Sequence, residues 1–203
     1  MATHVIVFAD ALGLENFDLF GFSLGGFVAQ QVTLDRPNLV HRLILAGTGP
    51  EGGEAIGGYP PSITERATRQ VPIEDDFLHL FFSPTPTSQA AGRAFWKRRH
   101  ERKNQDVLSS PAAMAAQAEA IGAWGVIPNQ NRYAQLKRIE QPTLIVNGRD
   151  DVMVPTINSY ILQQQLPNAT LIIYPDSGHG AIFQFPQLFM RHATMFLRGD
   201  QAG

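Results

Sequence analysis

The residues with the clearest chemical potential begin with a serine in a tight turn. Ser23 lies in the stretch Gly21–Gly26, which matches Gly-x-Ser-x-Gly and stands between an expected strand and an expected helix. A serine on such a turn projects clear of the backbone, and the glycines let strand and helix pack closely. The backbone N–H of Leu24, at the helix start, can then donate to a developing oxyanion. We interpret Ser23 as a nucleophile and the Leu24 N–H as an oxyanion donor.

A serine hydroxyl is a weak nucleophile without a base, and the base needs an orienting acid. Two later loops supply both residue types, because Asp150 and Asp151 follow one apolar run and His179 follows the next. Polar groups that follow the carboxyl ends of parallel strands gather at one edge of a sheet. His179 lies between two glycines and suits the role of base, while either aspartate suits the role of acid.

The elements that must position these residues alternate between strands and helices. Apolar runs predict strands at 18–22, 42–46, 143–147 and 170–174, and helical spacing predicts helices at 3–12, 24–34, 156–166 and 186–197. Strands that alternate with helices indicate an α/β fold with a parallel sheet. In the first helix, Val5, Phe8, Ala9 and Leu12 fall on one face, which we expect to be buried.

The pattern changes in the middle of the chain. Residues 49–61 are rich in glycine and proline, and helices are predicted at 62–70, 74–82, 87–103 and 111–123 with no strand among them. We therefore expect a core made of 1–49 and 139–203, with 50–138 inserted as a helical cap. Five aromatic residues within this insertion are expected to form its own core or to line a pocket beneath it, namely Phe81, Phe82, Phe95, Trp96 and Trp124.

Composition excludes several classes of function. The chain has 203 residues, no cysteine and a net charge of −2, which removes disulfide scaffolds and thiolate chemistry and does not favour a polyanionic partner. The basic run 97–103 is interrupted by Glu101 and is read as a solvated helix face, so no nucleic-acid partner is expected. We also expect no metal site, no cofactor, no membrane span and a cytoplasmic location.

Taken together, the three motifs resemble the α/β-hydrolase superfamily, in its lid-bearing esterase, lactonase and haloperoxidase-like branch. The resemblance is carried by the turn around Ser23, by the loop Asn147–Pro155 and by the stretch Asp176–Gly180. In the family pattern the acid stands three residues after the loop glycine, which selects Asp151 over Asp150. The resemblance implies a Ser23–His179–Asp151 triad that cleaves an ester or lactone of a small, fairly apolar compound through an acyl-enzyme.

The resemblance also shows what this chain lacks. Family members begin with about four strands and a helix ahead of the serine turn, and one of those segments carries a second oxyanion donor. We expect a truncated sheet of about four strands, with an exposed edge at 18–22 through which the chain forms a homo-oligomer. The alternative function is a truncated, weak or inactive hydrolase-like protein that binds a small ligand or self-associates.

Overall fold

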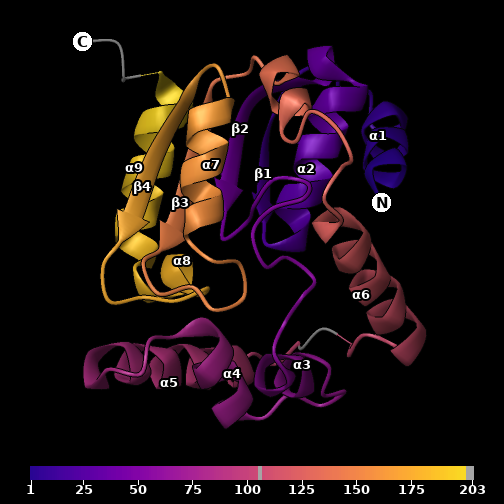
Figure 1. The fold of residues 1–203 in the computed structure, drawn as a ribbon. Helices are drawn as coiled ribbons and strands as arrows, with labels where there is room; N and C mark the ends of the chain where they lie inside the picture. The colour runs from indigo at the N-terminus through magenta and orange to yellow at the C-terminus, as the bar shows by residue number, and fades with distance from the viewer. Residues whose placement is uncertain (105–106, 200–203) are drawn as a thin grey trace.

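The fold is an α/β structure built on a four-stranded parallel sheet (Figure 1), in a computed structural model that describes residues 1–104 and 107–199. The strands lie in the order β1-β2-β3-β4 and are β1 (Phe17–Phe22), β2 (Val40–Ala46), β3 (Thr143–Gly148) and β4 (Ala169–Tyr174). All three neighbouring pairs are parallel. The expected fold class is confirmed, and each predicted strand lies within two residues of its observed position.

Helices cover both faces of this sheet, which explains why its central strands are apolar throughout. Leu43 and Leu45 of β2 face one hydrophobic cluster, and Ile44 and Ala46 face another. The first cluster is completed by α1 (Ala2–Ala11), α2 (Leu24–Asp35) and α7 (Ile157–Gln165), and the second by α8 (Ala181–Gln184) and α9 (Pro186–Arg198). A parallel strand buried on both faces has no polar side to display, so its sequence is continuously hydrophobic.

The register of the strands brings their carboxyl ends together. Phe22 is opposite Ala46, Ala46 is opposite Val146, and Gly148 is opposite Tyr174. The loops that follow β1, β3 and β4 therefore begin at the same edge of the sheet. Ser23, Asp151 and His179 lie in these three loops, and the fold thus places their backbones in one neighbourhood.

Four α-helices come between β2 and β3 in the chain, ahead of a short 3₁₀ helix, η2 (Ala134–Arg138), and no strand lies among the residues described there. They are α3 (Pro61–Ala67), α4 (Glu74–Phe81), α5 (Pro86–His100) and α6 (Pro111–Gly125). Prolines stand in the first turns of α3, α5 and α6, where a missing N–H is harmless. Figure 1 shows α3, α4 and α5 beyond the carboxyl ends of the strands, on the side where the three loops emerge.

The buried face predicted for the first helix is correct for Val5 and Ala9 and wrong for Phe8 and Leu12. Ala9 is buried, but the Phe8 and Leu12 side chains are 65% and 58% exposed. The face that packs on the core is formed instead by Ala2, Val5 and Ala9 together with Ile6. Small alanines allow α1 to approach α2 closely, and this close approach turns the larger Phe8 and Leu12 outwards.

The β1 strand has a hydrogen-bonded neighbour on one side. It pairs with β2, and within the described ranges no strand pairs with its other edge. Phe20 in the middle of β1 is 48% exposed, although its ring also lies 5.8 Å from that of Phe189 in α9.

None of the helices formed by the described residues combines the length and the apolar character that a membrane crossing requires.

Candidate functional site

Ser23 occupies a strained turn between β1 and α2. Its backbone adopts φ 53° and ψ −124°, a conformation that L-residues rarely take and that a nucleophile turn requires. The Ser23 N–H donates to Ala46 O at 2.9 Å, and Thr48 Oγ1 donates to Ser23 O at 2.8 Å. The serine precedes the first residue of α2 but its side chain does not cap that helix. The turn is therefore held by backbone contacts, and the hydroxyl is left available.

Two glycines near Ser23 lie where a side chain would collide with neighbouring atoms. A Cβ on Gly21 would lie 2.4 Å from Gly25 O, and one on Gly26 would lie 2.5 Å from the Thr48 side chain. Leu24 opens α2, where the first N–H groups have no partner within the helix. The predicted oxyanion donor is thus a helix N-terminal amide next to the serine, as the sequence pattern requires.

Asp151 and His179 are joined directly. His179 Nδ1 and Asp151 Oδ2 are 2.8 Å apart, and both side chains are almost wholly buried. The other carboxylate oxygen, Oδ1, accepts the N–H groups of Met153 at 2.8 Å and Val154 at 2.9 Å. A carboxylate fixed in this way sets the tautomer and the ring orientation of the histidine and leaves Nε2 for proton transfer.

Asp150 points elsewhere. It forms an ion pair with Arg149 at 3.0 and 3.1 Å and accepts a hydrogen bond from Ser83 Oγ at 3.0 Å. The hydrogen bond from Arg149 is the main reason that the pKa of the Asp150 carboxyl lies below its usual range, with Ser83 adding to the effect against partial burial. Of the two aspartates weighed from the sequence, Asp151 is the one that contacts the imidazole.

The loops after β3 and β4 approach each other closely enough to need glycine. A Cβ on Gly148 would lie 2.1 Å from Gly178 O. The Asp150 N–H donates to Ser177 O at 2.9 Å, and the Arg149 N–H donates to Tyr174 O at 2.9 Å. These contacts bring Asp151 within reach of His179.

Ser23 is linked to the imidazole through its neighbour Phe22. The rings of Phe22 and His179 are 4.9 Å apart, and a Cβ on Gly47 would lie 3.1 Å from the first ring and 3.3 Å from the second. Among the hydrogen bonds of the described residues, none joins the Ser23 hydroxyl to His179. Catalytic hydrogen bonds often tighten only when substrate binds.

A cavity of about 530 Å³ lies beside the serine. Ser23, Phe27 and Met153 line it from the strand-end side, and α3 and α6 complete it with small or apolar side chains such as Ala67 and Ile121. The described residues that line it include no Asp, Glu, Lys, Arg or His. The size is typical of a pocket for a small organic molecule.

Two further residues of this region were not anticipated from the sequence. Thr48 holds the serine turn through its hydroxyl, and Tyr59 lines the cavity together with Ser23. Burial is the main cause that raises the pKa of Tyr59, and the charge of Asp151 adds to it, so the phenol stays protonated at neutral pH. Thr48 stands two residues beyond β2, and this position after a strand end could have indicated from the sequence that it lies near the site. No signal singles out Tyr59.

The aromatic residues of the inserted helices do not line this cavity. Phe81, Phe82, Phe95 and Trp96 pack with Phe77 in a cluster of their own. Trp124 stacks on Phe27 with ring centroids 5.2 Å apart and donates its indole N–H to Gly49 O. The first four residues thus take the structural role expected from the sequence, in a cluster that Phe183 of α8 joins, whereas Trp124 packs on α2 rather than in a core of the inserted helices.

Within residues 1–104 and 107–199, no group of three histidine or acidic side chains is placed so that it could hold a metal ion.

Known proteins similar to this chain share its fold. A family model described as "alpha/beta hydrolase fold" matches residues 1–186. A solved structure, an alpha/beta hydrolase fold protein from Chitinophaga pinensis, is 35% identical with a TM-score of 0.87, and the match covers 97% of this chain and 70% of that one.

Two curated relatives are hydrolases. The chain is 27% identical over 201 residues to a pimeloyl-[acyl-carrier protein] methyl ester esterase of Nitrosomonas europaea, covering 91% of this chain and 72% of that enzyme. It is 26% identical over 209 residues to a 2-hydroxymuconate semialdehyde hydrolase of Pseudomonas putida, covering 96% of this chain and 66% of that enzyme. The chain thus spans about two thirds of the Pseudomonas enzyme.

The packing of the serine turn predicts opposite results for two adjacent glycines. Gly26→Ala is expected to destabilise the protein by about 1–3 kcal/mol, because the new methyl group collides with Thr48. Gly25→Ala is the matched control, since a Cβ there meets nothing within 4 Å and alanine favours the helix. Urea unfolding of both variants checks this. Equal stability of the two would mean that the turn does not pack as described.

Proposed function

The chain belongs to the α/β-hydrolase fold family, and on this premise we propose that it is a serine hydrolase that cleaves an ester or lactone of a small, apolar, uncharged acyl compound. The observation that carries the proposal is the buried hydrogen bond between Asp151 and His179, at the sheet edge where Ser23 stands beside an apolar cavity. The hydrolase relatives support the same class of reaction. Nothing in the proposed reaction calls for a cofactor.

In the proposed reaction, His179 accepts a proton and then gives it up again. His179 Nε2 takes the proton from Ser23 Oγ, which attacks the carbonyl carbon of the substrate. The Leu24 N–H donates to the oxyanion, and His179 then gives its proton to the leaving alcohol as the acyl-enzyme forms. Water that loses a proton to His179 hydrolyses the acyl-enzyme and restores Ser23. Asp151 keeps the imidazole oriented and stabilises its charged form.

We assign residues 50–138 the role of a cap that shapes the acyl site. Side chains from α3 and α6 line the cavity opposite Ser23 and Phe27. The cap carries cavity-lining residues that are mostly alanine, threonine, methionine and isoleucine, so it offers contact area but no charge. An acyl chain with a carboxylate at its far end would lose solvation there without gaining a cationic partner.

The triad assignment predicts a sharp difference between adjacent aspartates. Ser23→Ala is expected to abolish hydrolysis of p-nitrophenyl butyrate, and Asp151→Asn to lower kcat by about three or more orders of magnitude. Asp150→Asn is the matched comparison and should lower kcat severalfold at most, because Asp150 contacts Arg149 and Ser83 rather than the imidazole. Steady-state kinetics decide the matter. A greater loss for Asp150→Asn would reverse the assignment, and retained activity in Ser23→Ala would favour a protein that only binds its ligand.

The uncharged lining predicts a preference between two substrates of equal chain length. The ratio kcat/KM for p-nitrophenyl hexanoate should exceed that for mono-p-nitrophenyl adipate by about tenfold or more, because the adipate carboxylate has no partner in the cavity. Gln117 lines the cavity from α6, and Gln117→Lys should narrow the ratio by supplying a cation. Equal rates on both esters in the unmodified protein would rule out selection by this cavity.

We also propose that the polypeptide of 203 residues self-associates through the outer edge of β1. Unpaired backbone groups along a strand edge are a template for pairing, and exposed Phe20 adds apolar surface. The outward-facing Phe8 and Leu12 of α1 contribute further apolar surface. Multi-angle light scattering should give a mass above the 22.3 kDa of one chain. A homogeneous monomer at micromolar concentration would contradict this proposal.

A further inference from the structure

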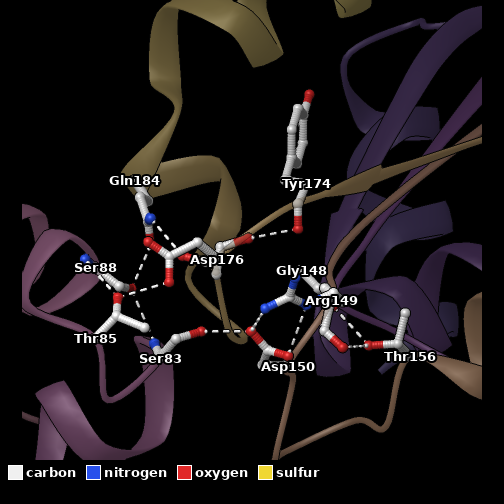
Figure 2. Close-up of polar contacts among 11 residues, drawn as sticks. Ser83, Thr85, Ser88, Gly148, Arg149, Asp150, Thr156, Tyr174, Asp176 and Gln184 are labelled. Carbon is white, nitrogen blue, oxygen red and sulfur yellow. Dashed lines mark hydrogen bonds and ion pairs between the residues drawn. The ribbon is translucent and has the colours of Figure 1, made fainter.

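The junction between α4 and α5 lies against the two loops that carry Asp151 and His179. We call residues 81–88 the clamp segment. Figure 2 shows Ser83, Thr85 and Ser88 of this segment facing Asp150 in one loop and Asp176 in the other. These loops follow different strands, β3 and β4, so the clamp segment is a common support for both.

Two bonds between a hydroxyl and a carboxylate make the connection. Ser83 Oγ donates to Asp150 Oδ2 at 3.0 Å, and Thr85 Oγ1 donates to Asp176 Oδ1 at 2.6 Å. Asp150 is adjacent to the proposed acid in sequence, and Asp176 stands three residues before the proposed base, His179. Hydrogen bonds to an ionised carboxylate are stronger than those between neutral groups. Each loop is thus anchored close to its functional side chain.

The polar groups around these two hydrogen bonds also bond to one another. Ser83 N donates to Ser88 Oγ at 2.9 Å, Ser88 Oγ donates to Gln184 Oε1 at 2.7 Å, and Gln184 Nε2 donates to Asp176 O at 2.7 Å. Thr85 Oγ1 also accepts the Ser88 N–H and caps α5. Ser83 and Ser88 are 2% and 0% exposed. Hydroxyls that are buried and fully bonded are held rigidly, which suits a positioning role.

The clamp segment also contacts the histidine loop through its backbone and one ring. The Gly180 N–H donates to Phe81 O at 2.7 Å, and a Cβ on Gly178 would lie 3.0 Å from the same oxygen. The Phe81 ring meets the His179 imidazole edge-on at 5.2 Å. The glycines on both sides of His179 are therefore the places where the clamp segment fits against the loop.

Asp176 holds an uncommon backbone conformation within this arrangement. Its φ is 50°, in the left-handed region where aspartate and asparagine are tolerated better than most residues. Such conformations persist where the surroundings fix them, and they cluster at functional sites. Here the Thr85 hydroxyl and the Gln184 amide hold the residue from two sides.

We propose that Asp150 and Asp176 are positioning residues, which hold Asp151 and His179 in register with the serine turn through the clamp segment. This inference rests on the proposed hydrolase function. Its physical basis is that a displacement of about 1 Å in a catalytic group can reduce a rate 10²-fold. The same segment belongs to the proposed cap, so the clamp also ties the cap to the two loops of the proposed triad.

The first test compares two substitutions of Asp176. Asp176→Gly keeps the backbone conformation but removes the carboxylate, and we expect kcat on p-nitrophenyl butyrate to fall about tenfold or more while KM changes less than about twofold. Asp176→Asn keeps an acceptor for Thr85 and tolerates the same φ, so it should restore most of kcat. Asp10→Asn is the control, because Asp10 pairs with Arg36 far from these loops.

The second test covers the case in which Asp176→Gly fails to fold. Ser83→Ala removes only the hydroxyl that donates to Asp150, and leaves the bond from Ser83 N to Ser88 in place. It should lower kcat severalfold at unchanged KM. Thr85→Ser retains both the donor to Asp176 and the helix cap, and should behave like the unmodified protein.

Three outcomes would overturn the inference. Unchanged kcat in Asp176→Gly and Ser83→Ala, with only a lower melting temperature, would make the clamp purely structural. A rise in KM at constant kcat in these variants would mean that the clamp segment affects substrate binding instead. Failure of a fluorophosphonate probe to label Ser23 in the unmodified protein would remove the proposed function and the inference with it. If the probe labels Ser23 but Asp176→Gly and Ser83→Ala keep their activity, the inference fails while the proposed function stands.

Discussion

The close approach of the loops after β3 and β4 is the constraint on which the candidate site depends. Gly148 leaves no room for a side chain against Gly178, and backbone bonds from Arg149 and Asp150 join the two loops. Only with the loops in this contact can Asp151 and His179 come within 2.8 Å of each other. Parallel pairing of β3 with β4 is what starts both loops from the same edge.

The serine turn, on the other side of the site, also depends on a close approach of backbone segments. Its glycines let α2 start directly against β1, and Thr48 from the end of β2 fixes its carbonyl group. The site is thus assembled from four strand ends, with rigid backbone contacts at each. Side chains on such a scaffold are placed by the fold rather than by their own flexibility, which is what a triad requires.

Much of this could be predicted from the sequence because local patterns determine it. The continuous apolar run at Leu43–Ala46 indicates a buried parallel strand, and the glycine spacing around Ser23 indicates the turn. The short helix α8 carries no comparable pattern over its four residues. The buried face of α1 was partly misplaced because Phe8 and Leu12 fit a helical period as well as the alanines do, and only packing against α2 decides between the two faces.

The contacts that join the clamp segment to the two loops were beyond prediction for the same reason. The bond between Thr85 and Asp176 joins residues 91 apart, and that between Ser83 and Asp150 joins residues 67 apart. Threonine and serine near prolines suggest only turns and helix caps. The cavity is likewise lined by alanines and methionines that the sequence does not distinguish from ordinary helix residues, while the conspicuous aromatic residues pack together elsewhere.

The central claim is that Ser23 forms a covalent acyl intermediate under the control of His179 and Asp151. The most direct test is rapid acid quenching of the protein with p-nitrophenyl butyrate, followed by intact-mass and peptide mass spectrometry. A butyryl group on the peptide that contains Ser23 is predicted, and it should be absent in Ser23→Ala and formed much more slowly in His179→Ala. Ester hydrolysis without an acylated serine, or with the acyl group on another residue, would contradict the account.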